Sequence, residues 1–264
     1  MLRRLDTITP IVKLLAYSEP NDEQSILVAE LGSRTLQEHV AAAKSSMTGS
    51  EFRSIAQQCC AALAALEELG LVAVDFKPSN IMAFPTVAHS ELWKLIDADG
   101  FVAAGAQVGA DDMTVTPVYC PPELARIYCE AETTIALPAN SHCWNLGVTM
   151  LEMLAGGETW LQKRYSVCRS VHGEDADGIV VSFFAWLAKR DAQLERERDA
   201  AIAKAVTSSS DARLRALLSS LLHVDRAARV SAHRAAEHAY FDTTEDGPLD
   251  ALLRCWEQLR RTKD

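Results

Sequence analysis

Two short stretches of this chain carry four polar residues in an order and at a spacing suited to one kind of chemistry. The first, V-D-F-K-P-S-N-I-M, holds Asp75, Lys77 and Asn80, and the second, K-L-I-D-A-D-G, places Asp97 directly after an apolar run. Carboxylate and amide oxygens are hard ligands suited to Mg²⁺, which clamps phosphate oxygens. The pattern therefore predicts a phosphoryl-transfer site. Asp75 would accept the proton of a substrate hydroxyl and Lys77 would steady the transferring phosphate, while Asn80 and Asp97 would hold the metal ion.

These stretches resemble the catalytic loop and the metal-binding segment of eukaryotic protein kinases. The resemblance covers almost the whole chain, because further kinase-like segments follow in the expected order: V-A-E-L ending at Leu31, T-P-V-Y-C-P-P-E ending at Glu123, C-W-N-L-G-V containing Trp144, D-R-A-A-R-V-S containing Arg229, and H-A-Y-F ending at Phe241. Small-molecule phosphotransferases share the acidic loop but are not expected to carry the later segments. The resemblance implies an α+β fold with a mostly helical large lobe and a truncated β small lobe.

The resemblance also implies roles for individual residues. The hinge of the family binds adenine through its backbone, which assigns Glu30 and Leu31 to the nucleotide. Thr116 takes the position of the threonine whose hydroxyl bridges the catalytic aspartate and lysine in Ser/Thr kinases. Glu123 and Arg229 correspond to a structural ion pair. The implied cofactors are ATP and Mg²⁺, and the implied substrates are serine and threonine hydroxyls of proteins.

The front half of the kinase small lobe has no counterpart in the sequence. The family uses a glycine-rich loop over the phosphates, a strand lysine on the α- and β-phosphates and a helix glutamate that orients this lysine. None of the three is present. Lys13, in I-V-K-L-L, lies too close to Asp75 to be that lysine and is expected to be an exposed strand residue. We expect a truncated chain in which residues 1–31 are a remnant of the small lobe and hinge, and residues 32–264 are the large lobe.

Further departures from the family lie in the large lobe. Ala73 and Ala98 replace a histidine and a phenylalanine that stack in the internal column of an active kinase, which predicts either a gap or a repacked column. His142 replaces an aspartate that anchors the backbone of the catalytic loop. Asp99, in D-G-F, offers a second register for the metal ligand, but the strand K-L-I before Asp97 favours Asp97.

Two functions of different classes follow from these matches and departures. The first is ATP-dependent phosphorylation of protein Ser/Thr hydroxyls, favoured by the retained polar residues of the catalytic loop and metal segment. The alternative is a catalytically inactive pseudokinase that binds or scaffolds a protein partner. It is favoured by the missing lysine and by the substitutions Ala73, Ala98 and His142.

Charge and hydropathy exclude other classes of function. The net charge of −10 argues against a nucleic-acid-binding surface, which needs clustered lysine and arginine. The seven cysteines show no metal-site spacing, so reduced thiols are expected. The sequence shows neither a signal peptide nor an apolar run of about eighteen residues, which predicts a cytoplasmic or nuclear protein without a membrane span. The oligomeric state stays open.

Hydrophobic periodicity predicts the order of elements. Ile11–Leu15 and Ile26–Leu31 are expected to pair as a hairpin, and Thr35 is expected to cap a short helix from Leu36 to Ala43. A longer helix is expected from a cap at Ser50 to Gly70, and Ala98–Met113 is expected to be a mobile loop. The remaining predicted elements are strands at Ile81–Phe84 and Leu92–Ile96 and helices at Cys143–Leu154, Val180–Ala188, Asp191–Ala205, Leu214–Leu222, Ser231–His238 and Leu249–Leu259.

Overall fold

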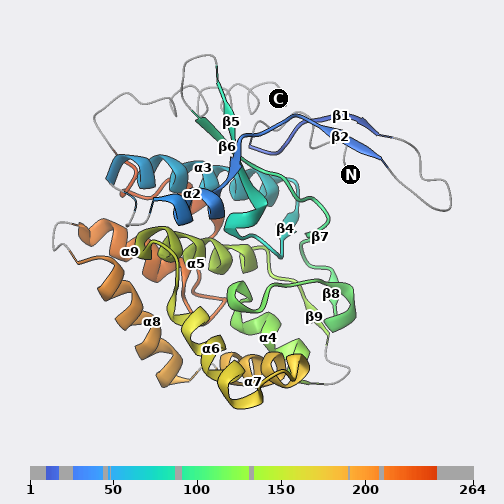
Figure 1. Cartoon of the computed structure of the whole chain (residues 1–264), viewed down its shortest axis with the longest axis vertical. Coiled ribbons are helices and arrows are strands. Elements are labelled where there is room, and N and C mark those ends of the chain that lie inside the picture. The colour runs from blue at the N-terminus through green and yellow to red at the C-terminus, as the bar shows by residue number, and fades with distance from the viewer. Residues whose placement is uncertain are drawn as a thin grey trace.

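A computed structural model describes residues 10–17, 26–43, 47, 49–86, 91–130, 134–189, 191–207 and 211–242 (Figure 1). The strands are β1 Leu14–Tyr17, β2 Leu27–Ala29, β3 Arg34–Thr35, β4 Leu71–Ala73, β5 Ile81–Pro85, β6 Glu91–Leu95, β7 Phe101–Ala103, β8 Gln107–Val108 and β9 Ile135–Ala136. The helices are α2 Leu36–Ala42, α3 Gly49–Glu68, α4 Pro122–Cys129, α5 Ser141–Ala155, α6 Trp160–His172, α7 Ala176–Ala188, α8 Ala192–Ala205, α9 Ala212–Leu221 and α10 Ala232–Ala236, with three short 3₁₀ turns η1 Pro78–Asn80, η2 Ala110–Asp112 and η3 Pro117–Tyr119. The predicted helix at Leu249–Leu259 lies outside the described residues.

The N-terminal strands form the predicted hairpin, which projects from the helical body (Figure 1). β1 and β2 are antiparallel, with a register irregularity between Leu14 and Ala16. The hairpin is tied to the body just before β1, where the backbone N–H of Val12 donates to the Leu95 carbonyl at 2.8 Å. Its large apolar side chains are mostly in solvent, and Leu31 after β2 is 91% exposed. Lys13 is exposed as predicted.

A small antiparallel sheet in the order β3–β5–β6 connects the hairpin to the helices. Ile81 pairs with Leu95 in the β5–β6 register, so the residues before β5 and after β6 lie at the same end of the sheet. α2 begins at this sheet, and its cap is the predicted one. The Thr35 hydroxyl accepts the N–H of Glu38, while the Glu38 carboxylate accepts the N–H of Thr35.

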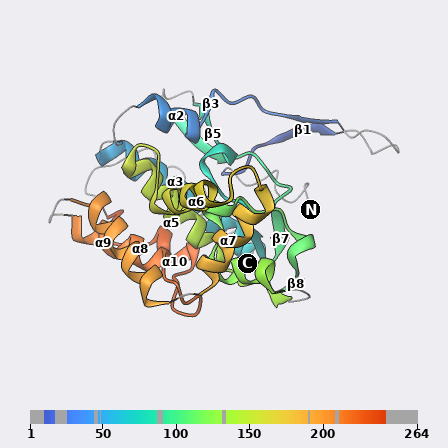
Figure 2. The same cartoon turned by 60° about the horizontal axis from the view of Figure 1, so that its bottom comes forward.

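The core of the body is built around α3 and α5. The sequence of α5 is apolar nearly all round, which is typical of a helix with no solvent face. Every residue from Ser141 to Met153 is buried, and Trp144 is among the largest fully buried side chains. The other helices surround this pair. Figures 1 and 2 both place α8 and α9 on the side of the body opposite β7 and β8.

The segment Ala98–Met113 was predicted as a mobile loop, and this was wrong. Phe101–Ala103 forms β7, which pairs antiparallel with β4, and Gln107–Val108 forms β8, which pairs with β9. Strands this short have too few residues to show a two-residue alternation of apolar side chains, so the pairing partners decide them. The segment is thereby fixed to the large body on two sides.

Three further differences concern helices. α3 begins at Gly49, so Ser50 lies inside the helix instead of capping it. α4 and α6 were not predicted. α4 is only eight residues long and α6 has a mixed composition, but each starts with a local helix signal. α4 has proline at its first position, and α6 is capped by the Thr159 hydroxyl, which accepts the N–H of Gln162.

The predicted fold class is confirmed, since the described elements are mostly helical with small antiparallel sheets. None of the helices in the described ranges combines the length and the apolarity that crossing a bilayer requires.

Candidate active site

The four polar residues of the sequence motifs come together where β4 and β6 end and β5 begins. Asp75 follows β4 by two residues, and η1 ends at Asn80 directly before β5. Pro78 opens η1, where its missing N–H costs nothing. Asp97 follows β6, and the N–H of the intervening Ile96 donates to the Asn80 carbonyl at 3.0 Å. The antiparallel register of β5 and β6 therefore sets Asn80 and Asp97 side by side.

Asp75, Lys77 and Thr116 form a closed triangle of hydrogen bonds. Lys77 Nζ lies 2.5 Å from Asp75 Oδ2 and 2.7 Å from Thr116 Oγ1. The backbone N–H of Thr116 donates to Asp75 Oδ1 at 2.9 Å. The side chains of Lys77 and Asp75 are 22% and 13% exposed, so both charges are partly shielded yet reachable from solvent. The geometry positions a carboxylate, an ammonium group and a hydroxyl around one point.

Asn80 and Asp97 present a set of hard oxygen atoms next to this triangle. Asn80 Nδ2 donates to the Asp75 carbonyl at 3.0 Å and to Asp97 Oδ2 at 3.3 Å. The amide oxygen of Asn80 accepts no hydrogen bond from the described residues and stays available as a ligand, and Asp97 is exposed. Asp99 contributes only its backbone N–H, to Asp97 Oδ1 at 3.2 Å. Asp97 is therefore the aspartate beside Asn80, and this donor set fits Mg²⁺.

Of the two predicted hinge residues, Glu30 is held by its neighbours, whereas Leu31 is 91% exposed. The N–H of Glu30 donates to the Lys13 carbonyl at 3.0 Å. The carboxylate of Glu30 accepts the Lys13 N–H at 2.7 Å and pairs with Lys94 Nζ at 2.5 Å. Lys94 also lies 4.9 Å from the centre of the Phe84 ring. Lys94 lies in K-L-I-D just before Asp97, but its partner Glu30 is 64 positions away in the chain, so no local pattern indicates this pair.

Ala73 and Ala98 leave little empty space. Ala73 pairs with Phe101 across β4 and β7, and the Phe101 ring is buried. The cavity bordered by Ala73, Phe101, Leu95 and the site residues is only about 10 Å³, close to the smallest that holds one water molecule. Of the two alternatives, the small size of this cavity favours a repacked column over a gap beside Ala73, with Phe101 as its cross-strand neighbour.

The substitution of His142 keeps an anchor for the catalytic loop. His142 is fully buried in α5, and its Nδ1 accepts the backbone N–H of Ala73 at 3.4 Å. One turn further on, Asn145 Nδ2 donates to the Val74 carbonyl at 3.3 Å. Two side chains of α5 thus hold the backbone of the two residues before Asp75.

Glu67, near the end of α3, completes this anchor. Its carboxylate accepts the backbone N–H groups of Ala232 at 2.8 Å and His233 at 3.2 Å, and it lies 3.4 Å from Nε2 of His142. Burial acts to raise the pKa of Glu67, but the hydrogen bonds from His142 and the two N–H groups outweigh it, and the pKa is lowered. Glu67, His142 and Cys143 bring one potential ligand atom each within 4.8 Å of one another. Because the carboxylate and imidazole already bond to protein groups, the cluster is explained without a metal ion.

The segment after Thr116 is held by two buried polar contacts. Arg229 binds Glu123 through two parallel bonds of 2.5 and 2.8 Å, and the two side chains are 0% and 4% exposed. Tyr119 donates a short hydrogen bond to Glu152 of α5. Burial raises the pKa of Glu152, although the hydrogen bonds from Tyr119 and Gln162 act to lower it. These contacts fix the position of Thr116 relative to the large body.

A comparison with models of known protein families matches residues 1–241 of this chain to the protein kinase domain. The chain belongs to the protein kinase domain family. A search of the curated proteins gave no match. Membership confirms the resemblance that the motifs indicated, and it supports a kinase-like function with ATP and Mg²⁺ as the cofactors of the family.

The sequence selected the residues that the site brings together, and it missed those that support them. Asp75, Lys77, Asn80, Asp97 and Thr116 lie within one connected hydrogen-bond network. The supporting residues that were missed are Glu67, Lys94 and Phe101. Glu67 lies in none of the quoted segments, whereas Lys94 and Phe101 lie beside Asp97 and Asp99 without an assigned role, and each of the three acts through a partner that is distant in the chain.

Proposed function

We propose that this chain acts as a protein serine/threonine kinase that transfers a phosphoryl group from ATP to protein hydroxyls. The observation that carries the proposal is the triangle of Asp75, Lys77 and Thr116 beside Asn80 and Asp97, which are joined by a hydrogen bond from the Asn80 amide nitrogen to the Asp97 carboxylate. A substrate hydroxyl that approaches Asp75 would find a carboxylate held ready to accept its proton. Lys77 would carry positive charge to the transferred phosphate.

Asn80 and Asp97 would hold Mg²⁺, which neutralises charge on the phosphate oxygens when it is bound. The protein residues do the positioning. Asn80 donates to the Asp75 carbonyl, so a ligand held by Asn80 is placed relative to the base at a fixed distance. Thr116 links the segment that follows it, where a substrate would bind, to the proposed base Asp75, and this supports the Ser/Thr assignment.

A scaffolding pseudokinase is the second candidate, and it has support of its own. Ala73, Ala98 and His142 stand where the family has a histidine, a phenylalanine and an aspartate around its catalytic loop and metal segment. A chain with these features would bind a protein partner through the kinase-like body without turnover.

A thermal-shift titration with ATP and Mg²⁺ separates the two candidates. A ligand that binds only the folded state at a hundredfold excess over its Kd stabilises it by about 2.7 kcal/mol. We expect a Mg²⁺-dependent shift that is lost in Asp97→Asn and kept in Asp99→Asn, a matched control two residues away. Phosphate transfer to a mixture of Ser- and Thr-containing proteins should then be lost in Asp75→Asn. A folded chain that shows no shift and no transfer would contradict the catalytic proposal and favour the scaffold.

The remaining assignments are proposed on the same basis. Residues 1–31 would supply the small-lobe strands and the hinge, with Glu30 and Leu31 offering backbone groups to adenine, and residues 32–264 would form the large lobe. The substrate or scaffold partner would be a protein in the cytoplasm or nucleus.

A further inference from the structure

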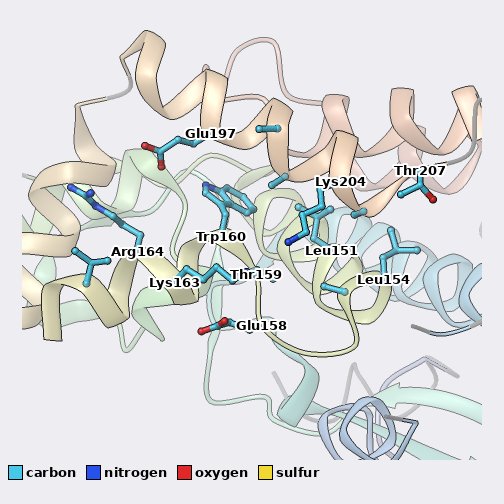
Figure 3. Close-up of a pocket in the computed structure, with 15 residues that line it drawn as sticks. Leu151, Leu154, Glu158, Thr159, Trp160, Lys163, Arg164, Glu197, Lys204 and Thr207 are labelled. Atoms are coloured by element: carbon cyan, nitrogen blue, oxygen red, sulfur yellow. The ribbon is translucent and has the colours of Figure 1, made fainter. Parts of the chain in front are cut away.

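A pocket of about 850 Å³ lies in the large body, lined by the end of α5, by α6 and by α8 (Figure 3). It lies within the range of small-molecule sites in proteins, which is about 300–1,000 Å³. None of the residues that line it belongs to the candidate active site. Its base is apolar, formed by Leu151 and Leu154 at the end of α5 and by the indole ring of Trp160.

The pocket is open because one of its walls carries small side chains. α8 contributes Ala200, Ala201 and Ala205, which are too short to reach across to Trp160. Larger apolar residues at these positions would fill the space, since protein interiors otherwise pack without voids of this size. The indole ring itself is fixed from behind, with its centre 6.3 Å from that of Trp144 in an edge-to-face arrangement.

Two side chains at this pocket have a buried N–H group without an acceptor. Trp160 Nε1 and Arg164 Nε are inaccessible to solvent and bond to none of the described residues. The Arg164 guanidinium lies over the Trp186 ring at 5.0 Å, which leaves Nε without a hydrogen bond. Both groups are donors only, and a buried donor without a partner costs about 1–3 kcal/mol.

The charges around the opening favour an anionic occupant. Lys163 and Lys204 are exposed, and neither forms an ion pair with another described residue. In Figure 3 the Lys204 side chain extends from α8 toward Leu151 and the Trp160 ring. Of the two acidic residues at the pocket, Glu197 accepts a hydrogen bond from the Gln193 amide at 2.9 Å, and Glu158 is exposed. Three cationic and two acidic side chains thus line the pocket, whereas the chain as a whole carries a net charge of −10.

We propose that the α5–α6–α8 pocket binds an amphipathic organic anion, an aliphatic carboxylate, as a ligand distinct from the nucleotide. The aliphatic part lies on Leu151, Leu154 and the Trp160 ring. The carboxylate lies at the opening between Lys163 and Lys204. The proposal is independent of phosphoryl transfer and holds for an active kinase and for a scaffold alike.

Isothermal titration calorimetry of the full chain with sodium decanoate tests this, with decanol as the neutral probe of the same length. We expect saturable binding of decanoate at one site. The charge reversals Lys163→Glu and Lys204→Glu together should weaken decanoate binding about tenfold and leave decanol binding nearly unchanged, because exposed ion pairs contribute modestly and additively. Lys189→Glu, an exposed reversal away from the pocket, is the matched control and should bind decanoate as the unaltered chain does.

A second variant tests the location without removing charge. Ala201→Trp places an indole in the open space and should abolish the binding of both probes while leaving the melting temperature nearly unchanged. Three results would each overturn the proposal: a folded chain that does not bind decanoate, equal losses in Lys189→Glu and the double reversal, or full binding in Ala201→Trp.

Discussion

Replacing Arg229 by methionine should destabilise the fold more than any exposed substitution in the same loop. Arg229 is completely buried and makes charge-assisted bonds to both oxygens of Glu123 and, through Nε at 3.1 Å, to the His223 carbonyl. Its guanidinium also lies 5.5 Å from the centre of the Trp144 ring. Methionine keeps much of the volume of arginine. It leaves the Glu123 carboxylate buried, with the Ser141 hydroxyl at 3.2 Å as its remaining side-chain hydrogen-bond donor among the described residues.

The expected magnitude follows from those contacts. Removing one member of a buried ion pair costs about 3–5 kcal/mol, because the remaining charge is left desolvated. The lost bond to the His223 carbonyl places Arg229→Met toward the upper end of that range. Since domains of this size shift by roughly 2–4 °C per kcal/mol, the melting temperature should fall by about 6–20 °C. Arg229→Lys keeps the positive charge without the two parallel bonds, so its stability should lie between that of the unaltered chain and that of Arg229→Met.

Urea unfolding followed by circular dichroism, run as a double-mutant cycle with Glu123→Leu, measures the effect. The double variant should lose less stability than the sum of the single variants, because it leaves no buried charge. Arg226→Met, an exposed arginine in the same loop, is the control and should change stability by less than about 0.5 kcal/mol. The reasoning is refuted if Arg229→Met matches Arg226→Met, or if the two single losses simply add.

Two further predictions concern the contacts below the site. Because the pKa of Glu67 is lowered from 4.5 in the folded state, its carboxylate stabilises the fold at neutral pH, and this contribution is lost as pH falls below about 4.5 through the folded pKa. Glu67→Gln should therefore be less stable than the unaltered chain at pH 7 and lose less stability on acidification. If the urea midpoints of the two proteins fell in parallel from pH 7 to pH 3, this prediction would be contradicted. Gly147 lies where α5 meets α9, and a Cβ there would come within 2.6 Å of the Leu222 side chain. Gly147→Ala should lower the free energy of unfolding by about 1–3 kcal/mol through overpacking, whereas a stabilised variant in thermal melts would show that Leu222 moves aside at no cost.

The parts of the fold that the sequence predicted are those in which one local signal is strong. Thr35 and Glu38 form the expected capping box, and the apolar run of α5 becomes a buried helix. The short strands β7 and β8 were missed because their stability comes from partners far along the chain, at β4 and β9. Such pairing has no local signature in a segment of two or three residues.

The candidate site divides in the same way. Asp75, Lys77 and Asn80 lie within one short stretch, so their spacing alone indicates a common role. The anchor beneath them joins Glu67 to His142 across 75 positions, and no pattern in either neighbourhood predicts that contact. The chemistry of the site was therefore readable from the sequence, whereas the support that positions it was not.

The exposed hairpin of β1 and β2 sets where this molecule opens first. Leu15, Tyr17, Ile26, Leu27 and Val28 are each between 44% and 60% exposed, so little of their apolar surface is protected on folding. A two-stranded hairpin with so little cover is marginally stable by itself. Its amide protons should exchange with deuterium through a local fluctuation of low free energy, while those of α5 exchange only when the whole body unfolds. The hairpin and the body thus differ in cooperativity, and a ligand that bridges them would slow exchange in the hairpin far more than in the body.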